Sequence, residues 1–133
     1  MPPSTSGPGS PQDWLRHAKS DLAVATQPPP EGVLYETLCY HAQQAAEKCL
    51  KAVLVDAGVA FPFTHSLARL ITIVQNSGVA WDTNLDQAAE LTEYAVESRY
   101  PGASRQITAG DLQQATELAG RVLAWAEGLI AKP

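Results

Sequence analysis

The sequence predicts an all-α protein, built as an up-and-down bundle of four longer helices and one short helix. Apolar residues recur at helical spacing in five segments of the 133-residue chain, and proline- or glycine-containing breaks separate these segments. No stretch shows the sustained apolar–polar alternation that predicts a β-strand. The chain is long enough for one hydrophobic core and too short for two.

The first helix follows a start that is rich in proline, serine and glycine. Residues 1–12 have a composition that buries little surface, so we expect a flexible tail outside a helical domain of residues 13–131. Ser10 and Pro11 supply a cap and a first helical residue, and apolar residues continue the helix to about Thr26. The three prolines at 28–30 then end the helix.

The strongest helical pattern runs from Glu31 to about Asp56 and ends before Gly58. Apolar residues occupy more than one face of this second helix, so we expect it to have neighbours on several sides and a central position in the bundle. Cys39 and Cys49 would lie about 15 Å apart along its axis, which is too far for a disulfide bond between them.

Three further helices complete the predicted bundle. Thr64 caps a short third helix that ends at the turn of residues 76–78. The fourth helix begins at Thr83 and reaches about Arg99, and the fifth begins at Thr108 and runs almost to the C-terminus. The fourth and fifth helices each begin with a threonine followed three residues later by aspartate, which resembles a capping box.

Composition and charge exclude several classes of protein. The chain has 9 Lys and Arg against 14 Asp and Glu, and this net charge of −5 argues against a protein that coats DNA or RNA. No apolar run approaches the roughly 20 residues that span a bilayer, and the start lacks the pattern of a signal peptide, so we expect a cytoplasmic protein. Two cysteines and three histidines do not form a zinc-binding spacing, and we expect no metal or cofactor.

Polar and basic residues gather on one arc of the second helix. Four of them lie within about 80° of its circumference, close to a packing face, on a chain that is acidic overall. The arc suits an anionic ligand such as a phosphate or, equally, the acidic face of a partner protein. A structural alternative is that Lys48 extends its ammonium to solvent while His41 is a hydrogen-bonded, half-buried imidazole. The candidate anion-binding residues are His41, Gln44, Lys48 and Lys51, with Arg99 beside one end of the arc. Arg99 and Arg105 bracket a turn that offers two guanidiniums to a phosphate, so Arg105 is a candidate as well.

Two further positions have structural interpretations of their own. His65 would be a first-turn residue of the third helix that packs under the connector of residues 61–63. Arg99 near the end of the fourth helix suits the helix dipole, and Tyr100 can pack its ring while its hydroxyl stays hydrated.

Four sequence motifs, in this order along the chain, carry a resemblance to a known family. They are Trp14 with Ala18, Asp21 and Leu22; the segment CYHAQQAAEKCLKA at 39–52; THSL at 64–67; and ESRYP at 97–101. This set resembles the HEPN family, a small helical domain named for nucleotide binding in higher eukaryotes and prokaryotes. The resemblance covers about residues 13–131.

The resemblance implies a four- to five-helix bundle that usually forms a homodimer and is often paired with a small nucleotidyltransferase-type protein. Some relatives are metal-independent RNases or toxins that use an arginine and a histidine separated by four to six residues. After Arg99 those positions hold Ser104, Arg105 and Gln106. A guanidinium cannot move protons near neutral pH, so the RNase interpretation loses its expected catalytic group.

Three functional hypotheses follow from the sequence. The first is a binding and assembly module, a homodimer that pairs with a nucleotidyltransferase-type protein and binds a nucleotide or another phosphate ligand. The second is an RNase of the toxin type from a two-component toxin–antitoxin module, which the missing histidine disfavours. The third is a structural dimer without a ligand.

Overall fold

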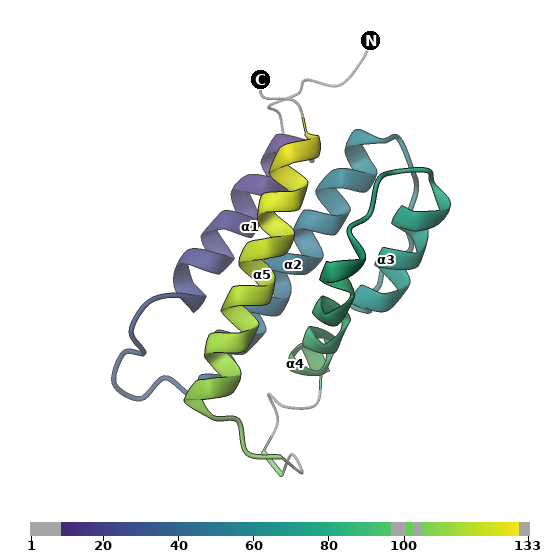
Figure 1. Cartoon of the computed structure of the whole chain (residues 1–133). Coiled ribbons are helices and arrows are strands. Elements are labelled where there is room, and N and C mark those ends of the chain that lie inside the picture. The colour runs from purple at the N-terminus through teal and green to yellow at the C-terminus, as the bar shows by residue number, and fades with distance from the viewer. Residues whose placement is uncertain (1–8, 97–100, 103–104, 131–133) are drawn as a thin grey trace.

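The structure, a computed structural model, describes residues 9–96, 101–102 and 105–130. All regular elements within these residues are helical, which confirms the predicted all-α class (Figure 1). The elements are α1 (Pro11–Ala25), α2 (Tyr35–Asp56), α3 (Leu67–Asn76), the 3-10 helix η1 (Thr83–Thr92), α4 (Glu93–Val96) and α5 (Ala109–Leu129). Within the part of the chain that the structure describes, no helix combines the length and the apolar character needed to cross a bilayer.

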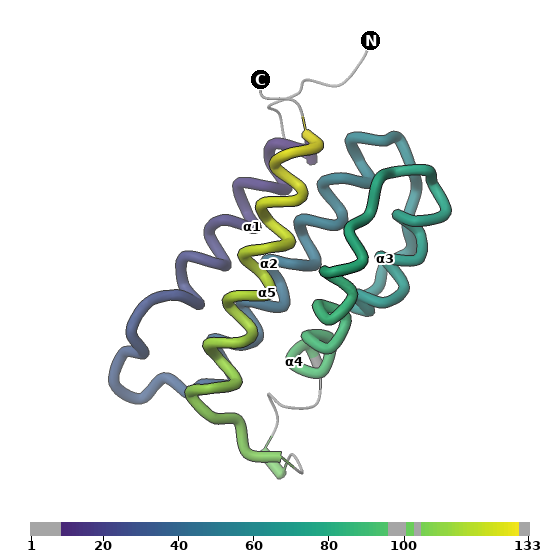
Figure 2. The backbone as a smooth tube through the Cα atoms, in the orientation of Figure 1, coloured from purple at the N-terminus to yellow at the C-terminus, as the bar shows by residue number. Residues whose placement is uncertain are grey.

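Helix α2 lies at the centre of the bundle, as predicted. It contacts α1 and α5 along much of its length and also packs against α3, η1 and α4 (Figure 2). Ala42, Ala45 and Ala46 on α2 are fully buried, and their small side chains let neighbouring helices approach closely. Cys39 and Cys49 are both free and buried. Burial raises the pKa of each thiol to about 12, so both stay protonated and unreactive near neutral pH.

The predicted starts of the first and last helices are confirmed. The hydroxyl of Ser10 accepts a hydrogen bond from the backbone N–H of Asp13, and Pro11 is the first residue of α1. Thr108 and Asp111 form a reciprocal capping box at the start of α5. Residues 1–8 of the predicted tail lie outside the described residues.

The predicted starts of α2 and α3 are wrong by a few residues. Helix α2 begins at Tyr35 rather than Glu31, because Gly32, at φ +83°, adopts a left-handed conformation that interrupts the helix. Helix α3 is capped by Ser66, whose hydroxyl accepts from the backbone N–H of Arg69. The hydroxyl of Thr64, the predicted cap, instead accepts from the N–H of Ser66.

The fourth predicted helix is mainly a 3-10 helix. Its buried residues, Leu85, Ala88 and Leu91, recur every three positions, which matches the three residues per turn of that geometry. Asp82 caps it by accepting from the N–H of Asn84, so the predicted cap at Thr83 is also wrong by one residue. A single α-helical turn, α4, follows, and the predicted end near Arg99 lies outside the described residues.

The connector between α2 and α3, residues 57–66, runs back along α2. His65 near its end contacts Gln43 and Glu47, which lie in the middle of α2 rather than at its C-terminus. This return path brings a polar segment of the connector against the most polar stretch of the central helix.

Candidate functional site

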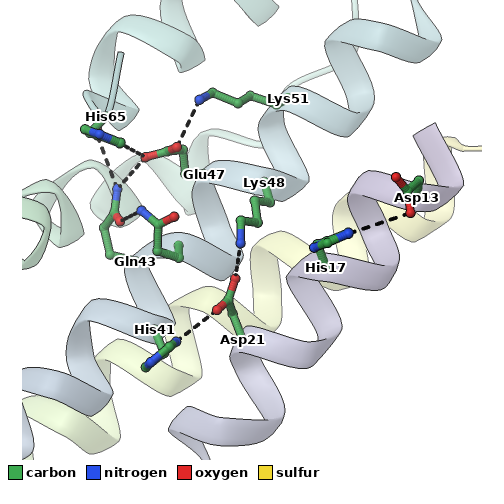
Figure 3. A network of polar contacts seen from close by, with 10 residues as sticks. Asp13, His17, Asp21, His41, Gln43, Glu47, Lys48, Lys51 and His65 are labelled. Atoms are coloured by element: carbon green, nitrogen blue, oxygen red, sulfur yellow. Dashed lines mark hydrogen bonds and ion pairs between the residues drawn. The ribbon is translucent and has the colours of Figure 1, made fainter. Parts of the chain in front are cut away.

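Two clusters of polar side chains surround α2 and are drawn together in Figure 3. The first, which we call the Glu47 cluster, joins α2 to the connector. The second, the Asp21 cluster, joins α2 to α1. The Glu47 cluster consists of Gln43, Gln44, Glu47, Lys51 and His65, and the Asp21 cluster consists of Asp21, His41 and Lys48.

Glu47 is the hub of the first cluster and is only 3% exposed. Its carboxylate accepts hydrogen bonds from Gln43 Nε2 at 3.0 Å, Lys51 Nζ at 2.9 Å and His65 Nδ1 at 2.9 Å. Burial acts to raise the pKa of Glu47, but these three hydrogen bonds outweigh it and hold the pKa below its usual value of 4.5. Glu47 is therefore ionised at neutral pH, and His65 Nδ1 must carry the hydrogen that the carboxylate accepts.

Amide groups extend the Glu47 cluster to the backbone of the connector. Gln44 donates from Nε2 to Gln43 Oε1 at 2.7 Å, and Gln43 donates from its own Nε2 to the carbonyl of His65 at 3.2 Å. Both glutamines are buried. This chain of contacts fixes the position of the connector at the point where it meets α2.

Aromatic rings enclose the ammonium of Lys51. Its Nζ lies 5.8 Å from the ring centroids of Trp14, Phe61 and Phe63, close enough for a cation–π contribution from each ring. The rings of Phe63 and His65 meet edge to face at 5.5 Å. Lys51 is thus buried between Glu47 and a set of aromatic faces, and it offers little charge to solvent.

The Asp21 cluster shares one carboxylate between two basic side chains. Asp21 on α1 accepts from His41 Nδ1 at 2.9 Å and from Lys48 Nζ at 2.6 Å. All three side chains are partly exposed, in contrast to the buried ion pair of Glu47 and Lys51. Because a carboxylate only accepts, the His41 hydrogen lies on Nδ1, and in the neutral ring Nε2 is left as an acceptor.

The structure divides the predicted anion-binding arc between the two clusters. His41 and Lys48 face Asp21, whereas Gln44 and Lys51 belong to the Glu47 cluster. Each of the three basic groups on the arc thus has a carboxylate as its nearest ionic partner.

Arg105, predicted to bracket a turn with Arg99, is half exposed and lies among acidic groups of α4 and α5. Its guanidinium contacts the hydroxyl of Tyr94 and the carboxylates of Asp111, at 3.0 Å, and Glu93. Hydrogen bonds to Tyr94, Asp111 and Glu93 raise the pKa of Arg105, so it remains charged. Arg99 and Tyr100 lie outside the described residues.

Sequence reasoning missed the two carboxylates that organise these clusters. The predicted packing of His65 against the connector holds for its contact with Phe63, but the hydrogen bond to Glu47 was not foreseen. His65 also precedes the cap of α3 rather than lying in its first turn. One available signal was the spacing of Glu47 and Lys51, four residues apart on one helix.

Two hollows lie near these basic residues. A cleft of about 570 Å³ is lined by residues 29 and 33–36, by Pro101 and Gly102, and by residues 105–107. A hollow of about 340 Å³ beside the Asp21 cluster is lined by Gly9, Asp13, Trp14, His17 and Lys48. In the described part of the chain, no three His, Cys, Asp or Glu side chains are grouped so that they could hold a metal ion.

The fold and the two clusters define a small helical-bundle domain whose central helix carries internally paired charges. Comparison with protein families matches residues 11–129 to the HEPN domain. The chain belongs to the HEPN family. It is similar to the crystal structure of ST0689, an archaeal HEPN homologue, with 28% sequence identity and a TM-score of 0.67, over 89% of this chain and 95% of that one. A search of curated proteins finds no significant match.

Proposed function

We propose that this chain is a HEPN binding and assembly module without RNase activity, which forms a homodimer and pairs with a nucleotidyltransferase-type protein. The observation that carries the proposal is the internal pairing of the polar groups on α2. His41 and His65 each direct Nδ1 to a carboxylate of the same chain, which is an arrangement that links elements of the fold.

The sequence supports the same conclusion for catalysis. Histidine is the side chain that exchanges protons most readily near neutral pH, and none follows Arg99 at the spacing that RNases of this family use. A module that binds and assembles needs no such group.

Exposed apolar side chains support self-association. Phe63 is 91% exposed and Leu34 is 61% exposed, so association with a second copy would remove large apolar side chains from water. Val24, Tyr35 and Leu129 are also exposed. Sedimentation equilibrium at micromolar concentration tests this part of the proposal: we expect a dimer, and a monomer across that range would overturn it.

Pairing with a nucleotidyltransferase-type protein rests on membership of the HEPN family and is tested by co-expression. A reading frame for such a protein beside the gene for this chain identifies the partner to use. When a tag is placed on this chain and both proteins are co-expressed, we expect the partner to purify with it. In the control, the tag is placed on an unrelated protein, and we expect the partner not to purify with that protein. Failure to co-purify with the neighbouring gene product would remove this partner from the proposal.

A phosphate-bearing ligand such as a nucleotide is a second candidate. The hollow beside the Asp21 cluster favours it, because Trp14, His17 and Lys48 line it. A phosphate there would take the place of Asp13 beside His17 and of Asp21 beside Lys48. Titration of ATP or GTP should show binding to the wild type that weakens in Lys48→Ala. Lys19→Ala, which changes an exposed lysine on α1, is the matched control. No binding to the wild type, or equal binding to Lys48→Ala, removes this candidate.

A further inference from the structure

The carboxylate of Asp21 is shared by two basic side chains, of which only one has a fixed charge. A lysine keeps its charge at neutral and acidic pH, whereas a histidine gains its charge between pH 8 and pH 5. One oxygen of Asp21 accepts from His41 Nδ1 at 2.9 Å, and the other accepts from Lys48 Nζ at 2.6 Å. While His41 is neutral, the negative charge of Asp21 therefore balances that of Lys48 alone.

Protonation of His41 changes this balance. The added proton goes to Nε2, because Nδ1 already carries the hydrogen that Asp21 accepts. Two positive charges then share one carboxylate, and Nε2 changes from an acceptor to a donor. The ring of Tyr40, which meets that of His41 edge to face at 5.6 Å, does not compensate, since a tyrosine hydroxyl is neutral in this pH range. The Asp21 cluster thus gains an attraction for anions that it lacks while His41 is neutral.

Lys48 connects the cluster to the hollow beside it. Its side chain is 24% exposed and lines that hollow together with Trp14 and His17. In Figure 3 the ring of His17 and the ammonium of Lys48 lie in the space between α1 and α2, with Asp21 and His41 further along the two helices. An anion in the hollow therefore competes with Asp21 for the ammonium of Lys48.

His17 adds a second titratable group to the wall of the hollow. Its Nε2 lies 3.7 Å from Asp13, beyond hydrogen-bond distance, and its side chain is half exposed. Hydrogen bonds from the backbone N–H of Gly9 and from Arg16 hold the pKa of Asp13 below its usual value of 3.8. Asp13 therefore stays ionised between pH 8 and pH 5, and His17 gains a charge beside it.

The permanent charges around the hollow balance one another. They are two carboxylates and two cations: Asp13, Asp21, Arg16 and Lys48. Two further ion pairs on the same helices, Lys19 with Glu127 of α5 and Lys51 with Glu47, each have no net charge. These groups carry no net formal charge while His17 and His41 are neutral, and protonation of both histidines adds two positive charges.

We infer that protonation of His41 and His17 switches the hollow from a site that binds anions weakly near pH 8 to one that binds them well near pH 5.5. The inference rests on the proposed phosphate-bearing ligand and states what regulates its binding. Lys48 and His17 line the site, whereas His41 acts through Asp21 and is a positioning residue. Because linkage is reciprocal, an anion that binds the charged form must also promote uptake of protons by the protein.

Sulfate titrations at pH 5.5 and pH 8, at constant ionic strength, test this switch. Sulfate keeps the same charge over this range, so only the protein titrates. By isothermal titration calorimetry we expect the wild type to bind sulfate about tenfold more tightly at pH 5.5, because one or two added charges lie close to the bound anion. Titrations at pH 6.5 in two buffers of different ionisation enthalpy should show that binding takes up protons.

Glutamine variants show which histidine carries the proton. His41→Gln can still donate a hydrogen bond to Asp21 but cannot become charged, so we expect it to keep the affinity at pH 8 and to lose most of the gain at pH 5.5. The double variant His17→Gln/His41→Gln should bind sulfate equally at both pH values. His65→Gln is the matched control, because His65 also directs Nδ1 to a carboxylate but belongs to the Glu47 cluster, and it should keep the gain. Circular dichroism checks the fold of each variant at both pH values.

The outcomes separate the switch from the ligand itself. A wild type that binds neither sulfate nor ATP between pH 5.5 and pH 8 overturns the proposed phosphate-bearing ligand and, with it, this inference. Equal sulfate affinity at both pH values, or a gain at pH 5.5 that persists in the double variant, overturns the switch alone. A gain that His65→Gln abolishes as completely as His41→Gln also overturns it, because the proton would then act through the fold and not at the hollow.

Discussion

At the residue scale, burial decides how much each carboxylate contributes to the free energy of unfolding. Glu47 and Asp21 each accept hydrogen bonds from two basic side chains, but Glu47 is buried while Asp21 and its partners are partly exposed. Removing one member of a buried pair leaves a charge without solvent or partner, whereas an exposed charge regains water. The two clusters should therefore respond very differently to equivalent substitutions.

Substitution of Glu47, the buried hub of its cluster, is the stronger test of this difference. Glu47→Gln keeps the shape but leaves the ammonium of Lys51 buried without its counter-charge, so we expect a loss of about 3–5 kcal/mol in the free energy of unfolding at pH 7. Urea denaturation measures it. Glu117→Gln, in an exposed pair with Arg121, is the control and should change stability by less than about 0.5 kcal/mol.

The pH dependence of the same variant has a defined sign. Because the pKa of Glu47 in the folded protein lies below its usual value of 4.5, its contribution is complete above pH 4.5 and declines as the pH falls through the lower folded value. We expect the free energy of unfolding of Glu47→Gln to fall furthest below that of the wild type above pH 4.5. The difference between the two proteins should become smaller in more acidic buffer. A deficit that is constant from pH 7 to pH 3 would contradict this account.

Asp21 should matter less for stability. Asp21→Asn leaves His41 and Lys48 beside water, so we expect a cost of about 1 kcal/mol or less, mainly from lost hydrogen bonds between α1 and α2. Chemical denaturation at pH 7 compares it with Glu47→Gln. A cost as large as that of Glu47→Gln would show that the Asp21 cluster is more desolvated than its exposure indicates.

The ionic partners of individual residues could not be predicted from the sequence. Helical spacing placed His41, Gln44, Lys48 and Lys51 on one arc of α2, but it could not show which acids they face. Asp21 comes from another helix, and its approach depends on how α1 packs. Glu47 sits within the same helix, and the sequence alone does not reveal that the returning connector buries it.

At the element scale, the caps of α1 and α5 were predictable from the sequence, whereas the caps of α3 and η1, Ser66 and Asp82, were missed by one or two residues. Ser10 and Thr108 begin their helices as expected because the hydroxyl, the proline and the carboxylate are adjacent in sequence. The 3-10 geometry of η1 was not foreseen, since Leu85, Ala88 and Leu91 fit a helical pattern of either period over so short a stretch. The contacts of this segment with α3 and α5 decide between the α-helical and the 3-10 geometry.

The cap of α5 can be tested directly. Thr108→Ala removes the hydroxyl that accepts from the N–H of Asp111, so we expect a loss of about 1 kcal/mol in unfolding free energy. Thr108→Ser keeps the oxygen and should retain most of that stability. Thermal denaturation followed by circular dichroism distinguishes the two, and equal losses in both variants would show that the methyl group, not the cap, contributes the stability.

At the scale of the whole molecule, the fold and the family were predictable while the function of the surface was not. Five amphipathic segments and four ordered motifs were enough for the all-α class and for membership of the HEPN family. A fold of this kind hosts different activities, and the groups that would decide among them are spread over separate elements. Because the charged groups of α2 are paired within the chain, the exposed apolar side chains are the better candidates for a function in binding.

The absence of RNase activity is the prediction that tests this view of the whole molecule. Metal-free cleavage of RNA requires a group that moves protons near neutral pH, and such transfer typically contributes about 10²–10⁴ in rate. No histidine follows Arg99 at the family spacing, and the carboxylates of Asp21 and Glu47 engage Nδ1 of His41 and His65. We therefore expect purified protein to leave single-stranded RNA intact in the presence of a chelator. Cleavage that disappears in Arg99→Ala would contradict this, and His41→Ala and His65→Ala would then identify which imidazole leaves its carboxylate to take part.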